Sequence, residues 1–291
     1  MNIIGTGLTG LVGSRIVELL SPRYAFTNMS LDTGVDITDR EAVTSRIESD
    51  MVSPWVLHLA AYTNVQQAEL DKPLGTESAA WKVNVEATQT IVDACKKTGK
   101  KLIYIDTDYA FDGMQKSYTE EDTPHPLCWY AETKSEGATR VLSLGKQGIV
   151  VRISNPYRAH PVGKTDFVHK MLERMNQGLP INAPKDQLFV PTFVDDLSTV
   201  VDGLIKHDAS GIYHAVGSTP VSPFEAATII AQAFGKDPSN IHETTFKEYF
   251  QNRAPTPQYA VLLDTKLSRY GITMHGFKEG IGIIVDQESR P

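Results

Sequence analysis

The chain has 291 residues, of which 41% are hydrophobic, so it can fill the core of one large α/β domain or of one domain with a smaller lobe. A formal net charge of −7 without a basic stripe argues against a nucleic-acid partner, and two cysteines are too few for a disulfide scaffold. The eight histidines lack metal-ligand spacing, so we expect no metal site. No apolar stretch could span a bilayer, so we expect no membrane partner. A strand starting at Met1 leaves no room for a signal peptide, and we therefore expect a cytoplasmic protein.

The first predicted elements are a strand, a glycine-rich turn and a helix. Residues 1–4 are mostly apolar and predict a short buried strand, whereas residues 14–20 form an amphipathic run typical of a helix. Between them, Gly7, Gly10 and Gly13 would let the backbone turn tightly, approach a pyrophosphate and pack a helix on the sheet. Such turns also occur for purely structural reasons. The position of this turn before a series of strands and helices favours nucleotide binding.

Strand-like and helix-like segments then alternate as far as residue 152. This alternation predicts parallel strands joined by right-handed crossovers, which is a doubly wound (Rossmann) α/β sheet. Strands are expected near 1–4, 24–27, 55–59, 101–105 and 148–152, and helices are expected to begin near Leu11, Asp39, Glu77 and Trp129.

The pattern loosens after residue 152. Helices are predicted at 166–176, 194–205 and 222–234, where Ser222 and Pro223 suit a helix start. We therefore expect a dinucleotide-binding domain at 1–152. Residues 153–291 should form mainly a smaller α/β substrate-binding lobe, with segments at about 190–220 returning to the Rossmann domain. A ligand would then lie at the carboxyl ends of the strands, beside the lobe.

The most informative segment follows the strand at 101–105. It reads Asp-Thr-Asp-Tyr-Ala-Phe-Asp-Gly at 106–113, and Tyr130 and Lys134 follow it at a spacing that places both on one face of a helix. A neighbouring cation favours a phenolate and would lower the pKa of Tyr130 toward neutral pH. Taken alone, such a pair is compatible with two exposed residues on one helix turn. Following this strand end, it predicts the chemistry of a carbonyl reductase.

These residues also carry a family resemblance. The glycine pattern, the segment Thr-Asp-Tyr-x-Phe-Asp-Gly and the Tyr-x-x-x-Lys pair resemble the extended short-chain dehydrogenase/reductases, and within them the dTDP-4-dehydrorhamnose reductase group. The resemblance implies that Tyr130 donates a proton to the developing alkoxide and that Lys134 contacts the nicotinamide ribose. It also implies that Thr107 holds the carbonyl oxygen and that Asp108 contacts sugar hydroxyls.

The resemblance implies a cofactor, NADP or NAD, and a set of residues that bind it. The predicted second strand ends without the acidic residue that favours NAD or the arginine that favours NADP, so we expect dual use or a modest NADP preference. Asp36 matches a position that touches the adenine, but it equally fits a helix N-terminal charge. The implied cofactor-binding residues are Gly7, Thr9, Gly10, Leu11, Val12, Asp36, Ile37, Ala60, Ala61, Tyr62, Tyr130 and Lys134.

Several other polar or aromatic residues have both a functional and a structural interpretation. Asn84 suits a water or ribose contact, and equally a bond to nearby backbone. His58 and Trp129 are expected to belong to the core. Arg158 and Lys164 lie in the loop after the fifth strand, where they could meet a diphosphate or be solvated. Because this segment supplies the only nearby uncommitted cations in the sequence, we expect the diphosphate over residues 154–164.

One position departs from the reductase group and leaves the function open. After the fifth strand, the reductases carry tryptophan followed by Val-Tyr-Gly, whereas this chain has Asn155, as the related sugar epimerases and dehydratases do. The leading interpretation is an NAD(P)H-dependent reductase of a nucleotide-linked 4-keto sugar, with Asn155 in contact with substrate. The alternatives are an epimerase or dehydratase with tightly bound NAD, and a non-catalytic subunit resembling the methionine adenosyltransferase β subunit. The nucleotide sugar is the expected partner, and a second copy of the chain in a homodimer is another candidate.

Overall fold

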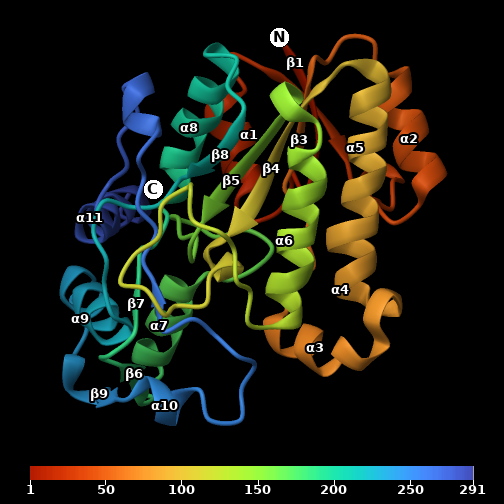
Figure 1. The fold of residues 1–291 in the computed structure, drawn as a ribbon. Helices are drawn as coiled ribbons and strands as arrows, with labels where there is room; N and C mark the ends of the chain where they lie inside the picture. The colour runs from red at the N-terminus through yellow and green to blue at the C-terminus, as the bar shows by residue number, and fades with distance from the viewer. Residues whose placement is uncertain (291) are drawn as a thin grey trace.

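A six-stranded parallel sheet forms the centre of the protein in a computed structural model that describes residues 1–290 (Figure 1). The strand order is β2-β1-β3-β4-β5-β8, and the direction of chain progression reverses beside β1, as in a doubly wound sheet. The predicted Rossmann α/β class is therefore confirmed. The strands are β1 (Asn2–Thr6), β2 (Ala25–Met29), β3 (Trp55–His58), β4 (Lys101–Thr107), β5 (Gly148–Ile153) and β8 (Gly211–His214).

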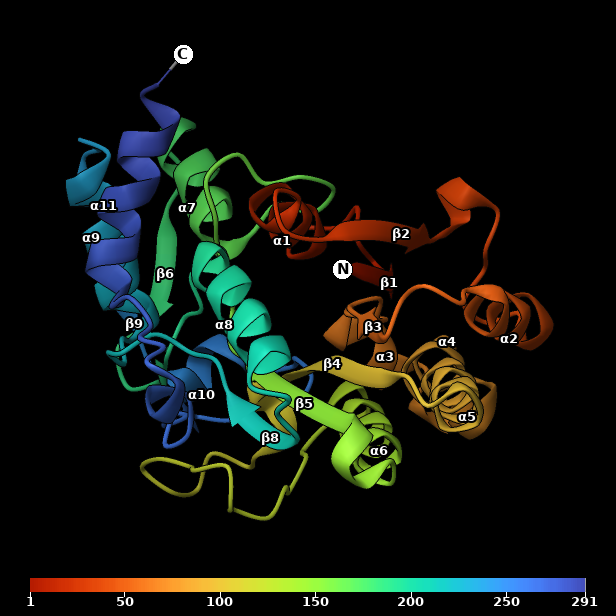
Figure 2. The same cartoon turned by 90° about the horizontal axis from the view of Figure 1, so that it is seen from above.

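Helices cover both faces of this sheet (Figure 2). On one face, α1 (Gly13–Leu20) packs against α8 (Val194–Lys206). The other face carries α2 (Arg40–Ser49), α5 (Ala87–Thr98) and α6 (Trp129–Leu142). The strand residues point alternately into two separate apolar cores, so that Ile103 and Ile105 belong to one and Leu102 and Tyr104 to the other.

The smaller lobe lies beyond the carboxyl ends of β4 and β5 (Figure 1). Its own core is made of aromatic and aliphatic side chains such as Tyr157, Phe193 and Phe277, which pack against one another. The lobe elements are α7 (Phe167–Asn176), β6 (Ile181–Pro184), β7 (Leu188–Phe189), α9 (Pro223–Ala233), β9 (Ile241–Thr244), α10 (Phe246–Tyr249), β10 (Tyr259–Ala260) and α11 (Phe277–Glu288).

Local sequence explains where the helices begin. Asp39 caps α2 and Asp166 caps α7, each accepting a hydrogen bond from a backbone N–H three residues ahead. Ser222 and Glu225 form a reciprocal capping box at the start of α9, with Pro223 in its first turn. The helix before β4 is composite, because α4 (Ala79–Trp81) continues through a π-helical turn (Lys82–Glu86) into α5. A short α3 (Val65–Leu70) precedes it.

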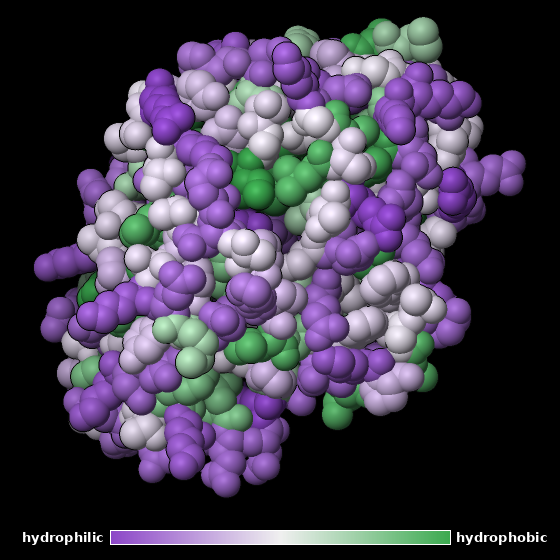
Figure 3. All heavy atoms as spheres, in the orientation of Figure 1, coloured by the Kyte–Doolittle hydropathy of each residue, from purple (hydrophilic) through white to green (hydrophobic). Residues whose placement is uncertain are grey.

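The face of the molecule drawn in Figure 3 is mixed, and no long apolar helix is present within residues 1–290. Figure 3 shows apolar residues in small separate groups among hydrophilic ones on the face drawn there. No helix of this part of the chain is long and apolar enough to cross a membrane.

Candidate active site

The three glycines after β1 make a turn in which each has a different environment. Gly7 has a φ of 67°, and a Cβ on it would lie 2.6 Å from the backbone nitrogen of Ala60. A Cβ on Gly13 would lie 2.2 Å from the carbonyl oxygen of Gly7. Gly10 is open by contrast, since its Cβ would meet only that same oxygen, at 3.4 Å. Gly7 and Gly13 are therefore required by the fold, whereas Gly10 leaves free space above the turn.

That free space belongs to a cavity of about 490 Å³ at the carboxyl ends of the strands. Its walls include the first turn of α1, the loop after β3 and the catalytic residues expected from the sequence. Thr9 is exposed, and Asp36, Ile37 and Tyr62, like Thr9, lie outside this lining. The predicted cofactor residues that do line it are Gly7, Gly10, Leu11, Val12, Ala60, Ala61, Tyr130 and Lys134.

Asp36 has a local structural partner. Its Oδ1 accepts hydrogen bonds from the backbone N–H and the hydroxyl of Thr38, at 2.9 and 2.8 Å. These bonds hold the pKa of the Asp36 carboxyl below its usual range. The residue that caps the following helix, α2, is Asp39. Asp36 therefore does not serve as the N-terminal charge of that helix, and instead stabilises the turn that leads into it.

Tyr130 and Lys134 project from α6 toward the end of β4, where Thr107 is located. All three residues are buried and line the cavity. The Lys134 ammonium donates a hydrogen bond of 2.7 Å to the carbonyl oxygen of Ile105 and lies 3.9 Å from the centre of the Tyr104 ring. Burial lowers the pKa of Lys134 to about 8. The spacing in the sequence thus brings the phenol, the ammonium and the threonine hydroxyl to one wall.

The electrostatics of Tyr130 differ from the expectation for an isolated Tyr–Lys pair. Burial raises the pKa of the Tyr130 phenol, and a hydrogen bond with Thr107 only partly opposes that rise. The Lys134 ammonium is directed at the Ile105 carbonyl and the Tyr104 ring. Tyr130 is consequently protonated at neutral pH, which is the form that a proton donor needs.

Asp108 lies between the wall formed by Tyr130, Lys134 and Thr107 and the neighbouring lobe, because it lines both that wall's cavity and a second one. Its Oδ2 accepts a hydrogen bond of 2.6 Å from the Ser154 hydroxyl, and its Oδ1 accepts one of 3.2 Å from Thr107. Burial raises the pKa of Asp108 to about 6. Asn155, with a positive φ of 39°, follows Ser154 at the end of β5. Asp108 therefore contacts Thr107 directly, and Asn155 is linked to Asp108 through Ser154, because its Nδ2 donates to the Ser154 hydroxyl at 3.3 Å.

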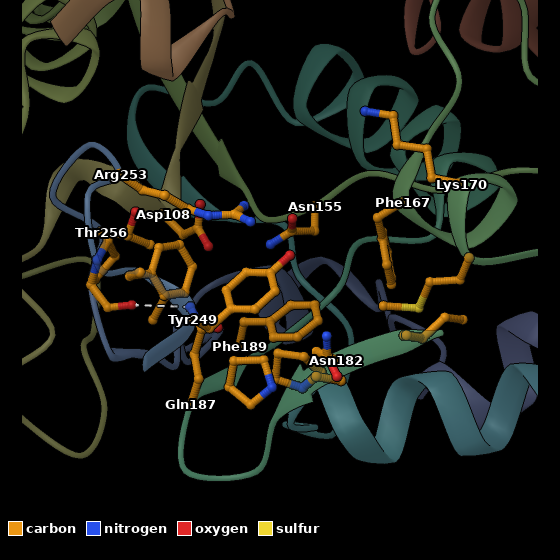
Figure 4. A pocket seen from close by; sticks show the side chains of 18 of the residues that line it. Asp108, Asn155, Phe167, Lys170, Asn182, Gln187, Phe189, Tyr249, Arg253 and Thr256 are labelled. Atoms are coloured by element: carbon orange, nitrogen blue, oxygen red, sulfur yellow. Dashed lines mark hydrogen bonds between the residues drawn. The ribbon is translucent and has the colours of Figure 1, made fainter. Parts of the chain in front are cut away.

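A second cavity of about 500 Å³ lies between the sheet and the lobe (Figure 4). It shares one wall with the first cavity, so the two spaces meet beside Tyr130 and Thr107. In the view of Figure 4, Arg253 lies on one side, near Asp108, and Lys170 lies on the other, near Phe167. The residues that line both cavities are Asp108, Tyr109, Asn155, Phe167 and Lys170.

The second cavity contains cations that sequence reasoning missed. Lys170 and Arg174 come from α7, and Arg174 donates from Nε and Nη2 to the carbonyl oxygen of Pro180, at 3.1 and 2.6 Å. Arg253 comes from the loop after α10, where it stacks 4.3 Å from the centre of the Tyr249 ring. Arg158, by contrast, is buried and donates to Ser14 at 2.8 Å. Because Lys170 and Arg253 lie outside residues 154–164, the expectation that the uncommitted cations lie only in that segment is wrong.

The remaining candidates occupy structural positions. His58 hydrogen-bonds with the hydroxyls of Thr6 and Thr88, and burial lowers its pKa to about 3. The Asn84 side chain accepts from the Tyr62 N–H at 2.8 Å and so holds the loop after β3. Trp129 stacks on a second tryptophan and lies outside both cavities. Lys164 donates to Thr63 across the rim of the first cavity, at 3.2 Å.

Comparison with known proteins gives consistent similarities over most of the chain. Residues 1–290 match the family model described as RmlD substrate binding domain. A dTDP-4-dehydrorhamnose reductase of Aggregatibacter actinomycetemcomitans is 31% identical over 236 residues, which cover 77% of this chain and 76% of that protein. A dTDP-4-keto-6-deoxy-D-glucose reductase of Streptomyces niveus is 28% identical, with 92% and 90% covered.

A solved structure agrees with these matches. The crystal structure of dTDP-4-dehydrorhamnose reductase from Bacillus anthracis, in complex with NADP, superposes with a TM-score of 0.89 at 28% identity. The alignment covers 98% of this chain and 99% of that one.

Proposed function

Because the chain belongs to the RmlD substrate binding domain family, we propose that it is an NADPH-dependent reductase of a dTDP-linked 4-keto-6-deoxy sugar. The observation that carries this proposal is the meeting of two cavities at one catalytic wall. The first cavity extends from the glycine turn to Tyr130, and the second extends from Asp108 into the lobe. A cofactor and a sugar nucleotide would therefore approach Tyr130 from opposite directions.

The first cavity suits a dinucleotide. Leu11 and Val12 stand at the start of α1, where backbone N–H groups and the helix dipole favour a pyrophosphate. Gly10 leaves the space in which the phosphates would lie. The bound cofactor would supply the hydride. Lys134 lines this cavity, so its ammonium could hold a ribose hydroxyl of the cofactor. No arginine or acid at the end of β2 restricts the choice between NADP and NAD.

Tyr130 is the proposed proton donor to the oxygen of the reduced carbonyl group. Its phenol is buried and protonated, and it lies beside the Thr107 hydroxyl, which can hold the same oxygen. The positive charge of Lys134 stabilises the phenolate that forms after the proton has left. General acid catalysis of this kind typically contributes about two to four orders of magnitude in rate.

The sugar nucleotide is proposed to extend through the second cavity into the lobe. Asp108 and Asn155 would contact the sugar, because they lie where the two cavities meet. Lys170, Arg174 and Arg253 supply the positive charge that a diphosphate requires, since guanidinium and ammonium groups bind phosphate oxygens through charge-assisted hydrogen bonds.

The proposal is tested by measuring NADPH oxidation with a panel of nucleotide-linked 4-keto sugars. A reductase consumes one cofactor molecule for each sugar reduced and exchanges the cofactor freely. An epimerase or dehydratase would convert its sugar without net oxidation of added NADPH. A regulatory subunit would do neither, although it could still bind the cofactor.

A further inference from the structure

A buried ion pair joins Asp106 at the end of β4 to Arg152, its neighbour on β5. The Arg152 Nε donates to Asp106 Oδ2 at 3.3 Å, and the two side chains are 2% and 0% exposed. The Arg152 Nη1 also lies 3.4 Å from His214 Nε2, and the guanidinium packs over the Phe111 ring. Glu120 accepts from the backbone N–H of His214 and closes the far end of this row. Buried charges are costly unless each is paired and hydrogen-bonded, so every charged group in this row is expected to have a partner.

One oxygen of Asp106 remains without a partner. Arg152 binds Oδ2, whereas Oδ1 is buried and has no hydrogen-bond donor among the described residues. Asp106 also lines the first cavity. A buried carboxylate oxygen that lacks a donor is costly, so its charge is expected to interact with a nearby cation.

That cation is Lys134. Its ammonium binds the carbonyl oxygen of Ile105, the residue that immediately precedes Asp106. The other groups that face Lys134 are His58 from β3, Tyr104 from β4 and Tyr130 on its own helix, and none of them carries a negative charge at neutral pH. Burial lowers the pKa of Lys134, and the charge of Asp106 opposes that effect.

We propose that Asp106 is a positioning residue for the reduction: its carboxylate, fixed by Arg152, keeps the Lys134 ammonium charged beside Tyr130. This inference rests on the proposed function for its catalytic meaning, but the interaction itself can be measured without turnover. Arg152 faces Asp106 from β5, and beyond it His214 is neutral at pH 7 because burial lowers its pKa to about 4. Glu120 is therefore the next anion, at the far end of the row.

The test compares three variants with the wild type. Asp106→Asn keeps the shape of the side chain and removes its charge. The double variant Asp106→Asn with Arg152→Met removes both charges, so it avoids an unpaired buried arginine if the single variant does not fold. Glu120→Gln is the matched control, because it removes the same charge at the far end. The pKa of Lys134 is followed by NMR of side-chain-labelled lysine, with Lys134→Arg to assign the signal, and kcat is measured against pH with NADPH and the keto sugar.

Loss of a nearby opposite charge should lower the pKa of Lys134 by about one unit. The alkaline limit of kcat should move down by a similar amount in Asp106→Asn, and by less in the double variant. Glu120→Gln should leave both close to the wild type. An unchanged lysine titration in both Asp106 variants would overturn the proposal, as would an equal shift in Glu120→Gln. If the wild type fails to oxidise NADPH, the proposed function fails, and the NMR titration still decides the role of Asp106.

Discussion

The Rossmann half and the lobe build their parts of the site in different ways. In the Rossmann half, the important groups stand at the ends of regular elements: the turn after β1, the end of β4 and one face of α6. In the lobe, the cations come from α7 and from a loop about eighty residues later in the chain. The first arrangement depends on the backbone, which suits a cofactor shared by many enzymes. The second depends on side chains, which suits the choice of substrate.

The largest expected effect tests the Rossmann half. Tyr130→Phe removes the hydroxyl group that would donate the proton. It should lower kcat by about 100- to 10,000-fold, with the dissociation constant for NADPH nearly unchanged. Stopped-flow kinetics and cofactor titration measure the two quantities. Tyr24→Phe is the matched control, because it also loses a buried tyrosine hydroxyl, at the far edge of the sheet, and it should keep its kcat. Near-normal turnover in Tyr130→Phe would exclude the phenol as the acid.

A pair of glycine variants separates binding from folding within the same turn. Gly10→Val should fold normally and lose about 100-fold in NADPH affinity, because its side chain would fill the space reserved for the pyrophosphate. Gly13→Val should instead destabilise the protein by about 1–3 kcal/mol, because its Cβ overlaps the Gly7 carbonyl. Calorimetric titration and thermal unfolding distinguish these outcomes. Equal NADPH affinity in Gly10→Val and the wild type would show that the pyrophosphate does not lie against this glycine.

The lobe is tested by removing one cation. Arg253→Met should raise KM for the sugar nucleotide by about 10- to 100-fold, the usual weight of a hydrogen bond to a charged group, with a smaller change in kcat. NADPH affinity should stay the same, because Arg253 lines only the second cavity. Arg269→Met removes an exposed arginine outside both cavities and serves as the control. A fall in NADPH affinity without a change in KM would reverse the assignment of the two cavities.

The smallest effect is expected where the two halves meet. Asn155→Ala removes one exposed amide, so KM for the sugar nucleotide should rise by about fivefold, corresponding to roughly 1 kcal/mol, and kcat should fall by less. Free nucleoside diphosphate should compete with the substrate. Initial-rate measurements with dTDP as inhibitor check both points. If dTDP at millimolar concentration does not compete, the substrate is not nucleotide-linked.

The sequence predicted most of the Rossmann half because its signals are local. The glycine turn, the apolar strands and the Tyr130–Lys134 spacing each lie within a few residues. The predicted strands and helices of that half all have counterparts in the structure.

The lobe has no comparable signal. Arg253 is separated from Lys170 by more than eighty residues, and only the tertiary packing of α7, β6 and α10 brings them to one cavity. Nor could the sequence show that Arg158 is committed to Ser14, because that contact joins segments 144 residues apart. The electrostatics of Tyr130 were also hidden, since burial depends on the complete fold.

The central claim is that the two cavities bring a reduced cofactor and a keto sugar to Tyr130. The most direct test uses NADPH deuterated at the transferable position of the nicotinamide, together with a dTDP-linked 4-keto-6-deoxy sugar. One deuterium is expected at C4 of the sugar product for each NADPH oxidised, and this transfer should be largely lost in Tyr130→Phe. An unlabelled product, or conversion of the sugar without oxidation of NADPH, would show that Tyr130 does not serve a reduction by NADPH.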